Sequence, residues 1–271
     1  MQVAHRAAPE LAGVLRSFVG YQHDGLQPGE HLGMPSTTLT FVLSTDDPID
    51  VAFGGRRRRY DVVVGGLHTS AATIHHGARQ RGIQLAIDPL ASRALLGVPA
   101  SELAESVIDL DELWGDRAAR LRDAAGSADC LADQCAAVAG LLSRDDVDGV
   151  RREVTIAWRL ILRSGGRIGV QQLADSVGWS RRHLEQEFRR ELGITPKQAC
   201  RLRRFEHALS LVRNDAPLAE AAVRAGFADQ PHLTRDWRAL TGTTPRGWRQ
   251  SDRLAFVQDS ANALRHSESH D

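Results

Sequence analysis

Two stretches in the C-terminal third place polar and basic side chains beside apolar ones at helical spacing. In residues 181–192, Leu184 and Phe188 fall on one face, and arginine, glutamate and glutamine occupy the others. Farther along the chain, Leu233 and Trp237 have the same spacing. Arginine and glutamine can form paired hydrogen bonds with the edges of guanine and adenine, and glutamate can accept one from cytosine. Both stretches therefore favour recognition of base pairs.

The residue types that usually carry catalysis or bind metals are not arranged for either purpose. The three cysteines, Cys130, Cys135 and Cys200, include no C-x-x-C pair, and no histidine or basic residue beside the first two would activate a thiolate. Four histidines of the N-terminal half, His31, His68, His75 and His76, could suggest a metal site, but no H-x-H pair with a following glutamate stands at metal-site spacing. Neither a Gly-rich phosphate loop nor a G-x-S-x-G motif occurs. We expect no catalytic residue, no cofactor and no metal.

The two polar stretches belong to a sequence repeat. Gly178 matches Gly226 at an offset of 48 residues. Later pairs match at an offset of 49, and they are Leu184 with Leu233, Phe188 with Trp237, Arg189 with Arg238, Gly193 with Gly242, Thr195 with Thr244 and Pro196 with Pro245. A period of this length usually marks a duplicated supersecondary unit.

Each copy predicts two short helices around a tight turn. In the first, a helix near 170–177 ends at Gly178, whose missing side chain permits a positive φ, and Ser180 can cap the helix 181–192. Thr195 and Pro196 then start a long helix with one apolar face, formed by Leu202, Phe205, Leu209 and Val212. The pattern predicts two helix-turn-helix units joined by a rigid helix.

The charge distribution divides the chain. Residues 155–250 carry 17 Lys and Arg against 9 Asp and Glu, whereas residues 1–154 carry 15 against 21, although the whole chain has a net charge of zero. A basic region supplies contacts to phosphate, and an acidic neighbour is repelled from a duplex. No apolar run approaches the roughly 18 residues of a membrane helix, and the N-terminus does not have the pattern of a signal peptide, so we expect a cytoplasmic protein.

The repeat in the C-terminal third closely resembles the DNA-binding domain of the AraC/XylS family of bacterial transcriptional regulators. The family's signature is present as Gly226-Phe227, His232-Leu233, Arg235, Trp237-Arg238, Gly242, Thr244-Pro245 and Trp248-Arg249. The resemblance covers roughly residues 157–250, and it departs at Trp237 and Trp248, where the family more often has Phe and Tyr. It implies an all-helical domain of about seven helices with two recognition helices in successive major-groove segments.

The resemblance also implies roles for individual residues. It assigns base reading to Arg182, Glu185, Gln186, Gln230, His232, Thr234 and Arg235, and DNA phosphate contacts are expected from Arg181, Arg189, Lys197, Arg238 and Arg246. Two of these roles stay open. Glu185 either reads a base or orients a neighbouring arginine by an ion pair, and Arg235 either contacts DNA or packs locally. We expect Arg201, Arg203 and Arg204 to form a solvated face.

The N-terminal part predicts a mostly antiparallel sheet. Runs rich in β-branched residues indicate strands at 38–44, 49–53, 60–64 and 82–87, while helices are expected at 89–96, 111–123 and 131–142. We expect Arg56–Arg59 to lie in a solvated loop, with an anion or DNA contact as the alternative. The overall class is therefore α+β, with a small N-terminal β-sheet or barrel domain with helices and a C-terminal all-α domain.

This part is more weakly similar to the N-terminal domain of many AraC-type regulators, through Gly82-Ile-Gln-Leu, Pro89–Gly97 and Val98–Leu103. The similarity implies ligand sensing, dimerisation through a hairpin that includes residues 131–142, or both. Aromatic and imidazole content suggests a ligand pocket at Tyr21, His31, His68 and Trp114.

We expect three segments, namely a sensor and dimerisation domain at 1–150, a DNA-binding domain at 151–250 and a polar tail at 251–271. The expected function is a transcriptional regulator that binds double-stranded DNA as a homodimer and responds to a small-molecule effector, with contact to RNA polymerase left open. The alternative is an enzyme or a constitutive architectural module fused to a DNA-targeting domain.

Overall fold

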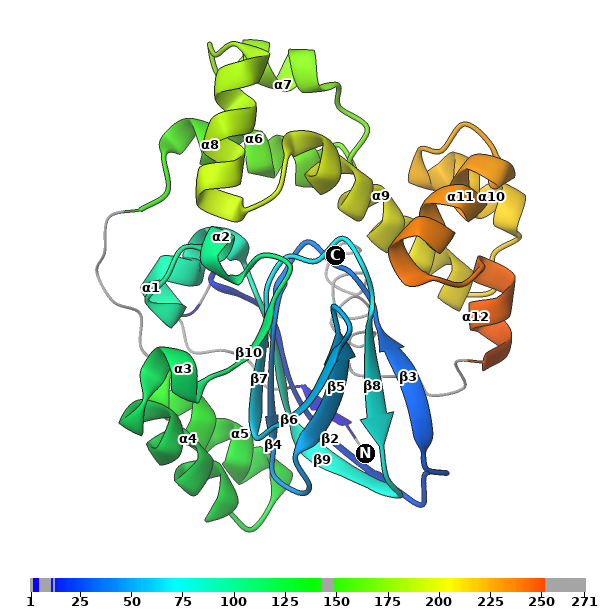
Figure 1. Ribbon diagram of the computed structural model, residues 1–271. Helices are drawn as coiled ribbons and strands as arrows, with labels where there is room; N and C mark the ends of the chain where they lie inside the picture. Colours follow the sequence, from blue (N-terminus) through cyan, green and yellow to red (C-terminus); the bar gives the residue numbers. More distant parts are fainter. Residues whose placement is uncertain (1, 5–10, 12, 143–148, 252–271) are drawn as a thin grey trace, which may run out of the picture.

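The computed structural model describes residues 2–4, 11, 13–142 and 149–251. Strands β1–β10 and helices α1–α5 form a sheet region, and helices α6–α12 form a helical region at one end of the sheets (Figure 1). This is the α+β arrangement that the sequence predicts. The expected polar tail lies outside the described residues, apart from Ser251.

The strands of the sheet region pair antiparallel. Their bounds are β1 Gln2–Ala4, β2 Leu15–Asp24, β3 Gly29–Gly33, β4 Leu39–Ser44, β5 Ile49–Phe53, β6 Arg56–Tyr60, β7 Val62–Gly65, β8 Ala72–His76, β9 Arg79–Ile87 and β10 Val107–Asp109. A six-stranded sheet has the order β1-β2-β9-β4-β7-β10, and a four-stranded sheet has the order β3-β8-β5-β6. The two sheets face each other around a cavity.

Successive side chains along a strand point to opposite faces of the six-stranded sheet, and both faces are buried. Phe41 and Leu43 of β4 join the main apolar core with the helices, while Val42 between them packs toward the four-stranded sheet. Val62 and Val64 of β7 likewise face the core, and Val63 faces the other sheet. One sheet therefore serves two layers.

Helices cover the outer face of the six-stranded sheet. They are α1 Ser92–Leu96, α2 Ala100–Leu103, α3 Asp111–Trp114, α4 Asp116–Gly126 and α5 Leu131–Leu141, preceded by a 3-10 turn at Pro89–Ala91. Helix α5 packs closely on β2, because a Cβ atom at Gly20 would lie 2.7 Å from Cys135 Sγ and 2.8 Å from Leu131 Cγ. The apolar face of residues 131–142 is thus used within the chain, against its own sheet.

The helical region has the expected repeat. Its helices are α6 Arg152–Arg163, α7 Val170–Ser176, α8 Arg181–Leu192, α9 Pro196–Arg213, α10 Leu218–Ala225, α11 Gln230–Thr241 and α12 Pro245–Ser251. The long helix α9 connects the α7–α8 pair with the α10–α11 pair (Figure 1). The Thr195 hydroxyl accepts from the backbone of Gln198, whose side chain accepts from the Thr195 nitrogen, so α9 begins with a complete capping box.

Three local expectations were wrong. The helix expected at 111–123 is broken at Gly115, whose φ of +49° separates α3 from α4. The strand expected at 60–64 divides at Asp61 into the end of β6 and β7, which belong to different sheets. The arginines at 56–59 lie on β6 instead of a loop, and Arg57 forms an ion pair with Asp50 of β5 at 2.8 Å.

Candidate nucleic-acid interface

Both helix-turn-helix turns depend on a glycine in the left-handed region. Gly178 has a φ of +71° and Gly226 has a φ of +85°. After each turn a side chain caps the next helix, because Ser180 Oγ accepts from His183 N at 3.2 Å and Asp229 Oδ1 accepts from His232 N at 2.7 Å. The left-handed glycine and the cap fix where each recognition helix begins.

The first recognition helix, α8, buries its apolar face completely. Leu184 and Phe188 are inaccessible to solvent. The polar side chains expected to contact DNA are exposed, and they are Arg181, Arg182, Gln186 and Arg189. Glu185 forms an ion pair with Arg189 at 2.9 Å, which is the orienting role that the sequence left open.

The second recognition helix, α11, is anchored by aromatic stacking. The Trp237 ring lies 5.0 Å from the ring of Phe205 on α9 and 5.5 Å from the ring of Trp248 on α12. Tryptophan at these two positions therefore provides the aromatic anchors that the sequence predicts.

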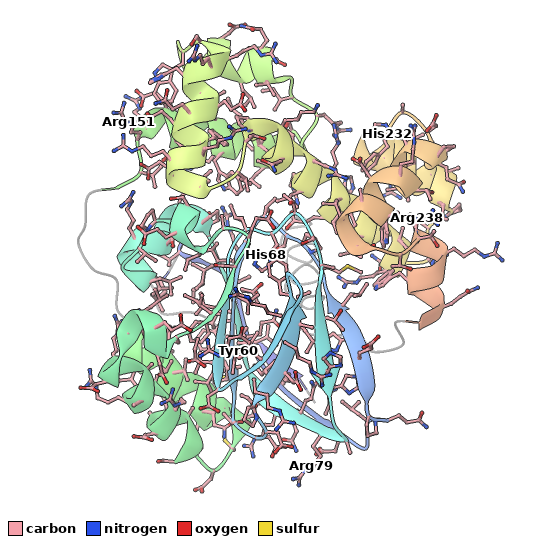
Figure 2. The ribbon with its side chains drawn as sticks, in the orientation of Figure 1. Tyr60, His68, Arg79, Arg151, His232 and Arg238 are labelled. Carbon is pink, nitrogen blue, oxygen red and sulfur yellow. The ribbon has the colours of Figure 1, made fainter. Side chains whose placement is uncertain are left out.

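Only some of the polar side chains of α11 are exposed to solvent. Gln230, Arg235 and Arg238 are exposed, whereas His232 and Thr234 are half-buried. The His232 ring packs edge-on against Phe227 at 5.3 Å, and Ala228 N donates to His232 Nδ1 at 3.4 Å. His232 therefore has a packing role in the turn. Figure 2 labels His232 and Arg238 on this unit.

The expected phosphate contacts beside helix N-termini are placed as predicted. Lys197 is exposed in the first turn of α9, directly after the Thr195 cap. Arg246 is exposed in the first turn of α12, where Thr244 Oγ1 accepts from Gly247 N at 3.0 Å. Both cations lie where main-chain N–H groups favour an anion.

The arginines of the connecting helix are not a solvated face. Arg201 pairs with Asp236 of α11 at 3.3 Å, and Arg203 donates to the carbonyl of Leu162 at the end of α6 at 3.3 Å. Arg204 lies over the Phe227 ring at 5.4 Å. These side chains hold α9 to α6 and to the second helix-turn-helix unit, so they make the connection rigid.

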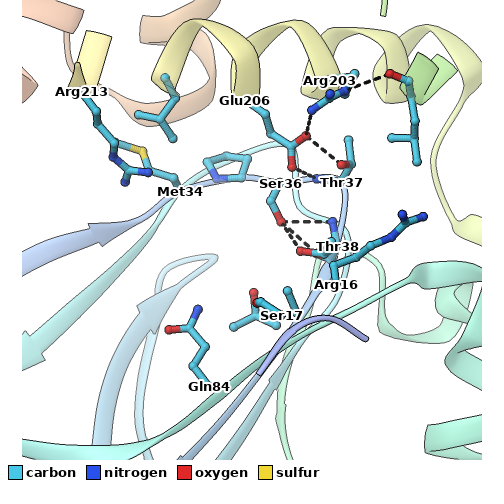
Figure 3. A pocket seen from close by; sticks show the side chains of 15 residues that line it. Arg16, Ser17, Met34, Ser36, Thr37, Thr38, Gln84, Arg203, Glu206 and Arg213 are labelled. Carbon is cyan, nitrogen blue, oxygen red and sulfur yellow. Dashed lines mark hydrogen bonds and ion pairs between the residues drawn. The ribbon is translucent and has the colours of Figure 1, made fainter. Parts of the chain in front are cut away.

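The helical region contacts the sheet region at separate points. Glu206 of α9 accepts hydrogen bonds from Thr37 N at 2.7 Å and from Thr37 Oγ1 at 2.8 Å, as the dashed lines in Figure 3 mark. Nothing in the sequence signals this pair, because its members are 169 residues apart.

Both recognition helices also bond to the sheet region near their C-terminal ends. Ser101 of α2 donates to the Arg190 carbonyl of α8, and the Ala71 nitrogen donates to the Leu240 carbonyl of α11, each at 2.7 Å. Arg93 of α1 adds an ion pair with Glu191 at 3.0 Å.

A cavity of about 100 Å³ lies between the two sheets. Tyr21, His31 and His68, three of the four residues suggested for a ligand pocket, line it (Figure 2 labels His68). Trp114 does not line it, since its ring packs between Phe41, at 6.4 Å, and the Arg117 guanidinium, at 3.9 Å.

Burial favours the neutral forms of the polar groups in this cavity. It lowers the pKa of His31 to about 3, with the neighbouring His76 ring adding to the effect, and it also lowers the pKa of His68. Burial raises the pKa of the Tyr21 hydroxyl. The cavity therefore offers neutral hydrogen-bonding groups among apolar ones, which are mainly Leu32, Val42, Val51, Val63 and Ile74.

Sequence reasoning missed the cationic residue of the cavity. Arg213, the last residue of α9, lines the cavity and also lies over the Trp248 ring at 5.3 Å. Its position at a helix end gave no signal that it would face a distant sheet.

Two of the three cysteines are buried, and the third, Cys130, is exposed. Burial raises the pKa of Cys135 and of Cys200 to about 11, which keeps both thiols protonated near neutral pH. Within the described ranges, no group of three or more His, Cys, Asp or Glu side chains is placed to hold a metal ion. A search of the same ranges finds no helix long and apolar enough to cross a membrane.

Comparison with known proteins gives the helical region its family. The family model described as "Helix-turn-helix domain" matches residues 173–251. Residues 173–251 are an AraC-type helix-turn-helix domain. An uncharacterized HTH-type transcriptional regulator of Staphylococcus aureus is 30% identical to the chain over 97 residues, which are 35% of this chain and 13% of that protein. YbfI of Bacillus subtilis, of the same description, is 32% identical over 66 residues, which are 24% of each chain.

One solved structure resembles this chain in both the sheet region and the helical region. ToxT of Vibrio cholerae aligns with a TM-score of 0.52 at 10% identity, covering 85% of this chain and 97% of that one. At this identity the likeness shows the fold alone. The chain spans only 13% of the length of the Staphylococcus relative.

Proposed function

We propose that the chain is a sequence-specific, DNA-binding transcriptional regulator whose sheet region senses a small molecule. The DNA-binding part of this proposal rests on the two recognition helices, α8 and α11. Each helix is buried on one face and polar on the other, and both are attached to the connecting helix α9. An AraC-type domain of this geometry binds double-stranded DNA, with two readers in successive major-groove segments about one helical turn, ~34 Å, apart.

Exposure ranks the base-reading residues that we propose. Arg182, Gln186, Gln230 and Arg235 are free to reach base edges. We assign Glu185 the role of orienting Arg189 through their ion pair. We assign His232 the role of packing against Phe227 in the turn before α11. Thr234 is half-buried, and we assign phosphate contacts to the exposed Arg181, Arg189, Lys197, Arg238 and Arg246.

The effector site that we propose is the cavity between the sheets. Its lining favours a small, largely apolar molecule with one or two hydrogen-bonding groups that can pair with Tyr21, His31 or His68. Arg213 couples the cavity to DNA binding, because it touches both the cavity and the Trp248 anchor. A ligand shifts DNA affinity only by binding two arrangements of the protein unequally.

We further propose that residues 1–150 sense the effector and form a homodimer, that residues 151–250 bind DNA, and that the protein acts in the cytoplasm. Helix α5 packs its apolar face on its own sheet, so the dimer contact that we propose uses the rest of the α4–α5 hairpin, where Leu141 has 38% of its surface exposed. Two tandem readers on repeated half-sites would raise affinity through effective concentration.

The deciding experiment measures binding of the full chain to the duplex upstream of its own gene at several salt concentrations. We expect the logarithm of the association constant to fall linearly with the logarithm of salt concentration, with a slope that reflects several phosphate contacts. Affinity that does not depend on salt, or that is equal for unrelated duplexes, would contradict a sequence-specific regulator.

A further inference from the structure

A groove of about 610 Å³ separates α6 from the sheet region on the side of α1. It is distinct from the cavity between the sheets, with which it shares no lining residue. Arg159 and Arg163 of α6 line one wall, and Arg16 of β2 and Arg93 of α1 line the other. Asp88 is the single acidic side chain among the lining residues.

The four arginines are not equally neutralised. Arg16 pairs with Asp88, and Arg93 pairs with Glu191 at 3.0 Å. Arg159 and Arg163 are exposed, and neither has an ion-pair partner within residues 13–142 and 149–251. They stand four residues apart on α6, where two like charges repel each other. Among the described residues, the lining of the groove therefore has more positive than negative charge, and the unpaired part is on the α6 wall.

We propose that this groove binds a small anionic molecule carrying phosphate or carboxylate groups. Guanidinium groups bind both kinds of oxyanion through paired N–H donors. Arg159 and Arg163 supply the free donors, and the Thr155 hydroxyl, which also lines the groove, offers a further hydrogen bond. Gly13, Val14, Ala91 and Ala94 leave room for the remainder of the ligand, because their side chains are small.

The location favours a small molecule over the DNA backbone. Arg159 and Arg163 are exposed, but the groove that they line is walled on its other side by the sheet region, which favours an anion small enough to enter it. The three donors, Arg159, Arg163 and Thr155, all belong to α6, so the anion is held mainly by this wall of the groove.

The test is calorimetric titration of the full chain with three probes, namely inorganic phosphate, pyrophosphate and citrate, at constant ionic strength set with potassium chloride. We expect saturable binding of one anion per chain for at least one probe. The double variant Arg159→Gln/Arg163→Gln should weaken that binding at least tenfold. Arg152→Gln is the matched control, because Arg152 is an exposed arginine of the same helix outside the groove.

Three results would overturn the proposal. The first is no saturable heat with any probe up to tens of millimolar. The second is equal affinity in the native chain and the double variant. The third is uniformly weaker DNA binding in the double variant with unchanged anion affinity, which would make these arginines duplex contacts. The single variant Arg163→Lys, which keeps the charge but loses the paired donors, guards against misfolding, and we expect it to bind phosphate with reduced affinity.

Discussion

Thr37 donates two hydrogen bonds to the Glu206 carboxylate, one from its backbone nitrogen and one from its hydroxyl, at 2.7 and 2.8 Å. The Glu206 side chain is 14% exposed and also pairs with Arg203 at 3.3 Å. The helix that joins the two readers is thereby attached to the loop between β3 and β4.

Removing the Thr37 hydroxyl should loosen this attachment. We expect Thr37→Val to lower the free energy of unfolding by about 1–3 kcal/mol, since a hydrogen bond to a charged and largely buried acceptor is lost. Urea denaturation measures the change. Thr38→Val is the control, because its hydroxyl bonds locally with Ser36. Equal losses in the two variants would show that the contact between regions contributes nothing.

Substitutions on the DNA-binding face should separate base reading from phosphate contact. Arg182→Ala should weaken binding to the specific site by about 1–3 kcal/mol and relax preference at one base position, whereas Lys197→Ala should weaken all duplexes alike. Competition binding with single-base variants of the operator distinguishes the two. If both variants have the same profile, the reading face is misassigned.

A side chain at Gly20 should push α5 away from β2. We expect Gly20→Ala to destabilise the fold by about 1–3 kcal/mol, because the new methyl group would overlap Cys135 and Leu131. Gly126→Ala is a matched control, since nothing lies within 4 Å of a Cβ atom there and alanine favours the helix. Thermal unfolding of both variants checks the prediction, and a neutral Gly20→Ala would argue against close packing of this helix.

Acid should destabilise the sheet region through His31. The pKa of His31 in the folded state, about 3, lies below its ordinary value of 6.5, so between these pH values the unfolded chain binds the extra proton. The stability contributed by neutral His31 is complete above pH 6.5 and falls as the pH decreases, by up to about 1.4 kcal/mol per pH unit. His31→Leu should flatten the stability profile between pH 6.5 and 4.5. Urea denaturation at each pH measures the profile, and an equal slope in the native chain and in His31→Leu would contradict the prediction.

The intact chain should be a dimer held by residues 1–150, and residues 155–250 alone should be monomeric. Light scattering at micromolar concentration measures both states. A monomeric full chain whose operator affinity is unchanged after removal of residues 1–150 would exclude the dimer mechanism.

The sequence predicted best those elements whose limits are set by neighbouring residues. Helix α8 has the expected bounds, 181–192, because Ser180 caps its start and Gly193, with a φ of +74°, ends it. Strand β5 likewise spans the expected residues 49–53. Local capping and alternation suffice for such elements, since no distant residue changes the result.

Relationships between distant residues could not be predicted in the same way. Arg201 and Arg203 have the sequence context of a solvated face, and only the position of Asp236 and the end of α6 makes them structural. Trp114 was grouped with Tyr21 by residue type, yet the helices fold it against the outer face of the sheet, beside Phe41.

The bonds from Ser101 and Ala71 end on main-chain carbonyls of the two recognition helices, at Arg190 and Leu240. A carbonyl is present whatever side chain its residue carries. The exposed side chains that choose a DNA sequence can therefore be exchanged during evolution without breaking these attachments. A lineage of such proteins can acquire new target sequences while the contacts between the sheet region and the helical region are inherited intact.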